Sequence, residues 1–324
     1  MKKQLLIAAV AATMTSAAMA DVSITGNAKF EYFNTQTSTV STNKTNTEVN
    51  LGVKGKNGDT SVVANLEFNT HGADSSGAID VEDLYMTTKV GDVTVKGGNY
   101  ASGTSGLLGE IDEGGRANNK VTLSTTINGV KVYAGNSGTA STGASQINGN
   151  MFVGVSAKVA GFTVQAKHNS PTVDSFGIAG DVAGFGVRLE TKQNDTANSD
   201  VTFGQIDKKV GDLALTLAWL DVDNTDSLVG ETDSAIFAVE NGGKASARDN
   251  MQVSAKTSVA GNTVTVKSGS IDKGISSTAD LDYTQIAVSR GLASGATFAA
   301  TYTDKDDSAT TDTQILELDL SVKF

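Results

Sequence analysis

The sequence predicts an all-β fold, a transmembrane antiparallel up-and-down β-barrel, on three observations. Apolar and polar residues alternate along many stretches, each about as long as the roughly 9–11 residues of a tilted transmembrane strand. Short glycine-containing turns alternate with longer polar loops. After the first 20 residues no apolar run is long enough for a transmembrane helix, which needs about 18 residues. Strands with one apolar and one polar face fit a barrel whose outside contacts lipid and whose lumen holds water.

The first element, residues 1–20, has the pattern of a secretory signal peptide. Lys2 and Lys3 precede an apolar, alanine-rich run that ends in Ala18-Met19-Ala20, an A-x-A cleavage pattern. A transmembrane anchor is the alternative, but the run is too short and too rich in alanine. We therefore expect cleavage after Ala20 and a single barrel domain over 21–324.

Turns and loops divide the rest of the chain into strands. Glycine supplies the positive φ of a tight hairpin, and Asn or Asp tolerates it. Eight short turns and nine longer connections join 18 strands, and an even number is expected of such a barrel. The short turns are Asn57-Gly58-Asp59, Val90-Gly91-Asp92, Asn128-Gly129, Ala160-Gly161, Ala183-Gly184, Val210-Gly211-Asp212, Ala260-Gly261-Asn262 and Leu292-Ala293-Ser294-Gly295. The longer connections lie near 35–46, 71–78, 101–118, 136–148, 169–174, 194–198, 223–249, 274–279 and 304–312.

The two-residue period assigns the faces of the strands. A β-sandwich gives the same alternation with its apolar face turned inward. The charged and hydroxyl side chains on nearly every polar face favour a water-filled lumen instead. By parity the lumen should receive Lys29, Lys54, Lys96, Lys120, Lys131, Lys167, Arg188, Lys256 and Lys267, together with Glu31, Glu48, Glu67, Glu82, Glu190, Glu317 and Asp319.

The last strand ends the chain with strict alternation. Leu316, Leu318, Leu320, Val322 and Phe324 share its apolar face. A closed barrel pairs its last strand with its first, which removes both edges. In this strand the chain resembles outer-membrane β-barrel proteins, whose final strand usually ends in an aromatic residue. The resemblance implies that Leu320, Val322 and Phe324 are read by the barrel-assembly machinery.

Residues 82–100, EDLYMTTKVGDVTVKGGNY, resemble a stretch of the general bacterial porins, through Tyr85, Gly91, Gly98, Asn99 and Tyr100. The resemblance implies 16 strands, a homotrimer in the outer membrane of a Gram-negative bacterium, and a third loop that folds into the lumen. That loop would be 101–118. A solvated acidic surface loop is the alternative.

Loop 101–118 has a composition that suits a pore constriction. Glu110, Asp112 and Glu113 concentrate negative charge beside Arg116, while Leu107, Leu108 and Ile111 could pin the loop to the wall. The resemblance implies a facing basic wall of Lys29, Lys54 and Lys120, with Lys96 nearby. Glu82 departs from the family, since porins often have an arginine there. Because charged rings select ions by sign, we predict weak cation selectivity.

The composition excludes several other functions. The net charge of −11 argues against nucleic-acid binding, and the absence of cysteine excludes disulfides and thiolate sites. No cofactor motif is present. His71 and His168 are the only histidines, so a barrel hydrolase is a weak alternative. Acidic runs such as 304–307 could collect Ca²⁺, although solvated charge is the simpler interpretation.

We therefore predict a channel for passive diffusion of small hydrophilic solutes and ions, without catalysis. A secreted β-rich adhesin or surface-layer protein is the alternative from another class.

Overall fold

The computed structural model describes residues 21–69, 79–101, 107–108, 116–136, 151–195, 199–224, 249–272, 280–307 and 312–324. The expected signal peptide lies outside these ranges. The described chain forms one closed antiparallel sheet of 18 strands. In chain order these are β1 (Asp21–Thr37), β2 (Ser41–Asn57), β3 (Thr60–Asn69), β4 (Ile79–Val90), β5 (Val93–Ala101), β6 (Arg116–Ile127), β7 (Val130–Asn136), β8 (Met151–Val159), β9 (Phe162–Asn169), β10 (Val173–Val182), β11 (Phe185–Asn194), β12 (Ser199–Val210), β13 (Leu213–Asn224), β14 (Asp249–Val259), β15 (Asn262–Asp272), β16 (Leu281–Gly291), β17 (Ala296–Asp307) and β18 (Thr313–Lys323).

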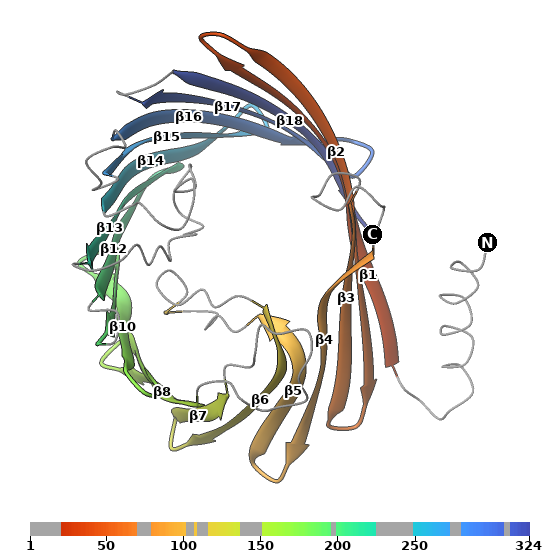
Figure 1. Cartoon of the computed structure of the whole chain (residues 1–324), viewed down its shortest axis with the longest axis vertical. Coiled ribbons are helices and arrows are strands. Elements are labelled where there is room, and N and C mark those ends of the chain that lie inside the picture. The colour runs from red at the N-terminus through yellow and green to blue at the C-terminus, as the bar shows by residue number, and fades with distance from the viewer. Residues whose placement is uncertain are drawn as a thin grey trace.

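Each strand pairs with its neighbours in the sequence, and β1 pairs with β18 to close the ring (Figure 1). At this seam Phe324 and Gly26 exchange two backbone hydrogen bonds of 2.8 and 2.9 Å. The predicted closure of the last strand on the first is therefore confirmed. In the described ranges, no helix has the length and apolar character that crossing a membrane requires.

The strand number settles the conflict between the turn count and the family resemblance. The structure has the 18 strands that the turns predict, and the 16 strands implied by the resemblance to general porins are wrong for this chain. Residues 162–182 form two separate strands, β9 and β10.

All eight predicted short turns lie between strands. Gly58, Gly91, Gly129 and Gly211 have positive φ, as tight hairpins require. In three turns the first central residue is an alanine in the left-handed region, with φ between 50° and 52°: Ala160, Ala183 and Ala260. Asn128 holds the equivalent place in the β6–β7 turn, with a φ of 50°.

The predicted loop at 35–46 is wrong. Residues up to Thr37 and from Ser41 onward continue the β1–β2 hairpin, so each strand has 17 residues. Polar side chains bridge the two strands: Asn34 Nδ2 and Tyr32 Oη donate to Asn43 Oδ1 over 2.6 and 2.9 Å. Polar composition here belongs to paired strands rather than to a loop, because cross-strand hydrogen bonds stabilise the hairpin.

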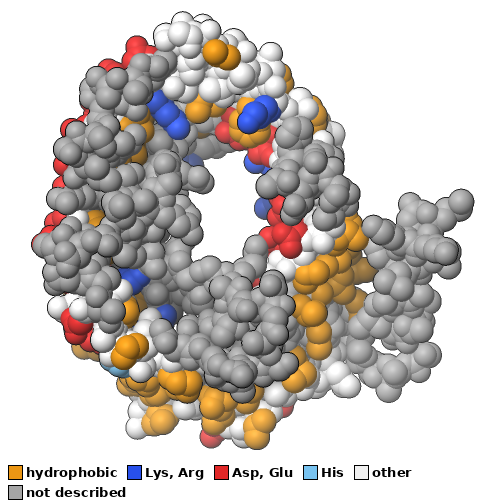
Figure 2. All heavy atoms as spheres, in the orientation of Figure 1, with side chains coloured by type: hydrophobic (Ala, Val, Ile, Leu, Met, Phe, Trp, Pro, Cys, Tyr) orange, Lys and Arg blue, Asp and Glu red, His pale blue; other side chains and the backbone are white. Residues whose placement is uncertain are grey.

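The outer face of the barrel is apolar. In β8 the outward side chains of Met151, Val153, Val155 and Val159 are exposed, and in β18 those of Leu316, Leu320 and Val322. Figure 2 shows apolar side chains along the outside and charged ones around the central opening. This is the inverse of a β-sandwich, whose apolar faces would be buried against each other. Lipid supplies the missing cover for such a surface.

Candidate functional site

The candidate site is the inner wall of the barrel. Directly paired residues of neighbouring strands share a face, so the register shows which side chains lie side by side. One row runs from β1 to β6 through Ser23, Lys54, Val63, Tyr85, Gly98 and Lys120. The register also places Lys131, Lys167, Arg188, Lys256 and Lys267 on the inner face, as predicted.

Two lysines and two tyrosines form a cluster on the inner face of β4–β6. The ammonium of Lys96 lies 3.9 Å from the ring centroids of both Tyr85 and Tyr100. Lys120 lies 4.4 Å from the Tyr100 ring and donates to the Tyr100 carbonyl over 3.4 Å. The hydroxyls of Tyr100 and Thr122 are 2.8 Å apart. Cations are attracted to the faces of aromatic rings, so the rings hold these charges in place. Lys54 of β2 lies in the same row as Tyr85, with Val63 of β3 between them. We call this surface the basic wall and define it by Lys54, Tyr85, Lys96, Tyr100 and Lys120.

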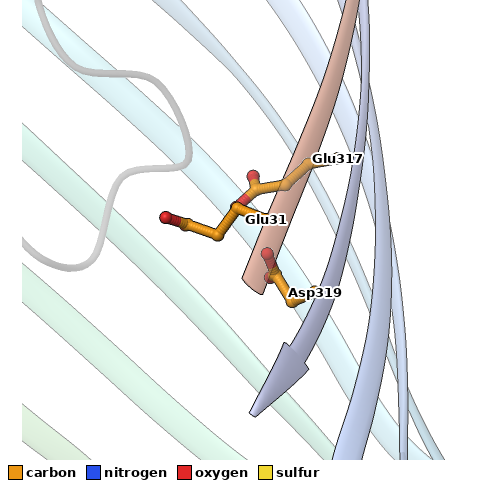
Figure 3. Close-up of side chains that lie close together, drawn as sticks. All are labelled: Glu31, Glu317 and Asp319. Atoms are coloured by element: carbon orange, nitrogen blue, oxygen red, sulfur yellow. The ribbon is translucent and has the colours of Figure 1, made fainter. Parts of the chain in front are cut away.

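Lys29, the remaining predicted basic residue, lies in an acidic cluster instead. It pairs with Glu31 and is 4.0 Å from Asp319. Glu31, Glu317 and Asp319 each place a carboxylate oxygen within 4.8 Å of the others, across the β1–β18 seam (Figure 3). Asn46 also donates to Glu31 over 2.8 Å. Lys29 is therefore compensated by neighbouring acids and is not part of a separate basic patch.

Glu82, a predicted wall residue, lies at a bulge between β3 and β4. The β3–β4 pairing shifts between Asn65 and Leu66, so Asn65 pairs with Asp83 and Leu66 with Val81. Glu82 is the extra residue of this bulge, and a bulge reverses the alternation beyond it. Asp83 and Tyr85 therefore share the lumen face with Asn65, whose amide donates to Asp83 over 2.7 Å. The predicted place of Glu82 in the lumen wall stays a prediction.

The predicted constriction residues Glu110, Asp112 and Glu113 lie outside the described residues. Arg116 is the first residue of β6, where only its backbone is described. Their role in the constriction stays a prediction. Leu107 and Leu108, from the same loop, are described.

Leu107 and Leu108 lie on a different part of the wall from the strands that flank them. Leu108 is fully buried in a cluster with Val201, Phe203, Ala218, Leu220 and Val222 of β12 and β13. The Leu107 carbonyl accepts a hydrogen bond of 3.3 Å from Arg188 of β11. The prediction that this leucine pair pins the loop to the wall is confirmed.

The apolar inner surface that receives the leucines was not predicted. Val201, Phe203, Leu220 and Val222 occupy the parity that is polar elsewhere, and all are buried. The signal was present in the sequence: β13 reads LALTLAWLDV, with apolar residues on both faces at its centre. We call this surface the apolar wall, defined by Val201, Phe203, Ala218, Leu220 and Val222.

The histidines give little support to a hydrolase. His168 Nδ1 lies 2.7 Å from Asp174 Oδ1, and both side chains are well exposed. His168 pairs in register with the outward-facing Val153, so this pair lies on the outside of the barrel, away from the lumen. His71 lies outside the described part of the chain.

No protein-family model matches the sequence, and no curated protein matches it either. Solved structures do share the fold. OccK1 (OpdK) of Pseudomonas aeruginosa is 14% identical with a TM-score of 0.68, and the match covers 94% of this chain and 98% of that one. OccK11 (OpdR) of the same organism is 11% identical with a TM-score of 0.69, covering 94% and 96%. OccK8 (OprE) is 11% identical with a TM-score of 0.66, covering 94% and 98%.

The fold and its surfaces define the class. A closed antiparallel barrel with an apolar exterior and a charged interior is the architecture of outer-membrane β-barrels. The chain has the fold of these barrels, with 18 strands.

Proposed function

We propose that the protein is a porin, a channel through which small hydrophilic solutes and ions diffuse passively across the outer membrane. The observation that carries this proposal is the interior of the barrel, where an opening with charged side chains around it remains (Figure 2). Leu107 and Leu108, from the third long connection, lie inside the barrel against β11 to β13. A barrel that served only as an anchor needs no such lining. The OccK and Opd structures that share the fold support the same reading.

Planar-bilayer recording of the detergent-purified, heat-modifiable protein tests this proposal. We expect discrete single-channel steps whose conductance scales with salt concentration. Folded protein that gives no steps would contradict the channel function. A secreted adhesin would remain in the aqueous phase without detergent, and a hydrolase would lose its activity on His168→Ala, whereas the porin would conduct unchanged.

We further propose weak cation selectivity. The inner face carries the predicted acids Glu31, Glu317 and Asp319. It also carries Asp83, which the alternation of the sequence had not assigned to the lumen. Acids exposed to a lumen favour cations. The homotrimer implied by the resemblance to porins remains a prediction, which the mass of the native complex in detergent would test.

The acidic residues of loop 101–118 provide the first specific test. The triple variant Glu110→Gln/Asp112→Asn/Glu113→Gln should shift the reversal potential in a salt gradient toward anions, because three negative charges leave the constriction. An unchanged reversal potential in a folded, conducting variant would show that these residues do not face the permeation path.

A further inference from the structure

The Leu107–Leu108 segment is held far from its own strands. Its loop leaves β5 at Ala101 and enters β6 at Arg116, yet the leucines contact β10–β13. Four strands, β7 to β10, separate β6 from β11 in the sheet. Leu107 and Leu108 therefore lie inside the barrel on a distant part of the wall, and the residues that contact them hold this pair in place.

Gly177 of β10 makes room for both leucines. A Cβ atom at this position would lie 2.8 Å from Leu107 Cγ and 2.8 Å from Leu108 Cδ2. Gly177 pairs with Glu190 and Gln165 in register, which places it on the inner face. Its φ is not in the left-handed region, so the backbone does not require glycine here. Glycine is required because the two leucine side chains occupy the space that a side chain at position 177 would fill.

Arg188 fixes the polar side of the same contact. It forms an ion pair with Glu190, which is fully buried, and its guanidinium lies 5.6 Å from the Phe203 ring centroid. In this orientation one terminal nitrogen donates to the Leu107 carbonyl over 3.3 Å. A guanidinium can serve an acid and a carbonyl at once because its donors form a rigid planar fork.

We propose that Gly177 and Arg188 are positioning residues that seat Leu107–Leu108 on the apolar wall and so determine the width of the channel. The proposal rests on the proposed channel function. Gly177 leaves room for the two leucine side chains, and the apolar wall buries Leu108. Arg188 donates the hydrogen bond to the Leu107 carbonyl. Without any one of these, the segment leaves its seat and the open channel becomes wider and noisier.

The variant Gly177→Ala tests whether the absence of a side chain at position 177 is needed to seat the two leucines. The added methyl group would displace both leucines, so we expect a higher single-channel conductance and more open-channel current noise. Gly186→Ala is the matched control. Gly186 lies on the inner face of the neighbouring strand β11, and a Cβ atom there would meet only Asp207, at 3.4 Å or more. Equal conductance and noise in the two folded variants would overturn the proposal.

The variant Arg188→Lys tests the directional bond without removing the charge. Lysine keeps the positive charge beside Glu190 but lacks the planar fork. We expect an unchanged reversal potential together with increased current noise. Wild-type noise in Arg188→Lys would show that the guanidinium does not hold the segment.

Disulfide trapping tests the seat itself and is independent of conductance. The chain has no cysteine, so the only thiols are those introduced. Leu107→Cys with Gly177→Cys should form a disulfide on mild oxidation, whereas Leu107→Cys with Gly186→Cys should not. Failure of the first pair to crosslink overturns the proposal, even in a conducting channel. Absence of conductance in a wild-type protein whose first pair does crosslink contradicts the channel function and leaves the seat established.

Discussion

The two walls of the lumen are built on opposite principles. On the basic wall, Lys96 and Lys120 lie against tyrosine rings, Lys96 partly exposed and Lys120 buried. On the apolar wall, Phe203 and Leu220 are buried as completely as residues in the core of a water-soluble domain. The same alternation of strand residues thus supports a permeation surface on one side and a docking surface on the other.

The difference between the walls shows that position in the lumen does not by itself define the chemistry of a residue. Residues of the apolar wall face inward yet meet protein rather than water, because Leu108 covers them. Burial against protein stabilises by about 25 cal/mol per Å² of apolar area. On the basic wall Lys120 is buried as well, but its ammonium lies against the Tyr100 ring, and Lys96 is held by cation–π contacts with Tyr85 and Tyr100.

The largest expected effect follows from breaking the apolar wall. Phe203→Ala should lower the free energy of unfolding by about 3–5 kcal/mol, because it leaves a cavity under Leu108 in a fully buried cluster. Urea unfolding in lipid vesicles measures this change. Phe298→Ala, on the lipid-facing side of β17 with 41% of the side chain exposed, should cost clearly less. Equal losses would mean that the apolar wall is not a core.

A smaller effect, on ion selectivity, should follow from breaking the basic wall. Lys96→Gln removes a positive charge from the lumen, so the reversal potential should shift toward cations. Phe203→Ala changes no charge and should leave the reversal potential where it is. If the two variants shift it equally, charge on the basic wall does not act on permeating ions.

The smallest effect compares two short turns, one next to β6 of the basic wall and one at the β10–β11 hairpin, which carries Gly177 and Arg188. Ala183 in the β10–β11 turn and Asn128 in the β6–β7 turn both have φ near 50°, which alanine tolerates less well than asparagine. Ala183→Asn should therefore stabilise the barrel by about 0.5–1 kcal/mol, and Asn128→Ala should destabilise it by a similar amount. The same unfolding experiment measures both. Changes of the same sign would contradict this explanation.

Most of the fold could be predicted from local patterns. The glycine turns gave the strand number, and the alternation gave the lipid-facing residues of β8 and β18. The prediction failed where polar composition was interpreted as a loop at 35–46, because a hairpin bridged by Asn34, Tyr32 and Asn43 is as polar as a loop.

The inner surface was predicted less completely. Parity assigned Lys54, Lys96 and Lys120 to one face, and the strand register gives them a common face, but parity could not detect the bulge at Glu82, which depends on how β3 and β4 align. The resemblance to porins grouped Lys29 with Lys54 and Lys120, although the pairing of β1 with β18 places Lys29 beside Glu31 and Asp319.

The sequence by itself determined the β-barrel class, the 18 strands and the two faces, because turn chemistry and the two-residue period are local properties. Only the tertiary structure decided which inward residues meet water and which meet Leu107 and Leu108. That choice depends on contacts between residues as far apart as Leu107 and Arg188, which come together only when the sheet closes and the loop crosses its interior.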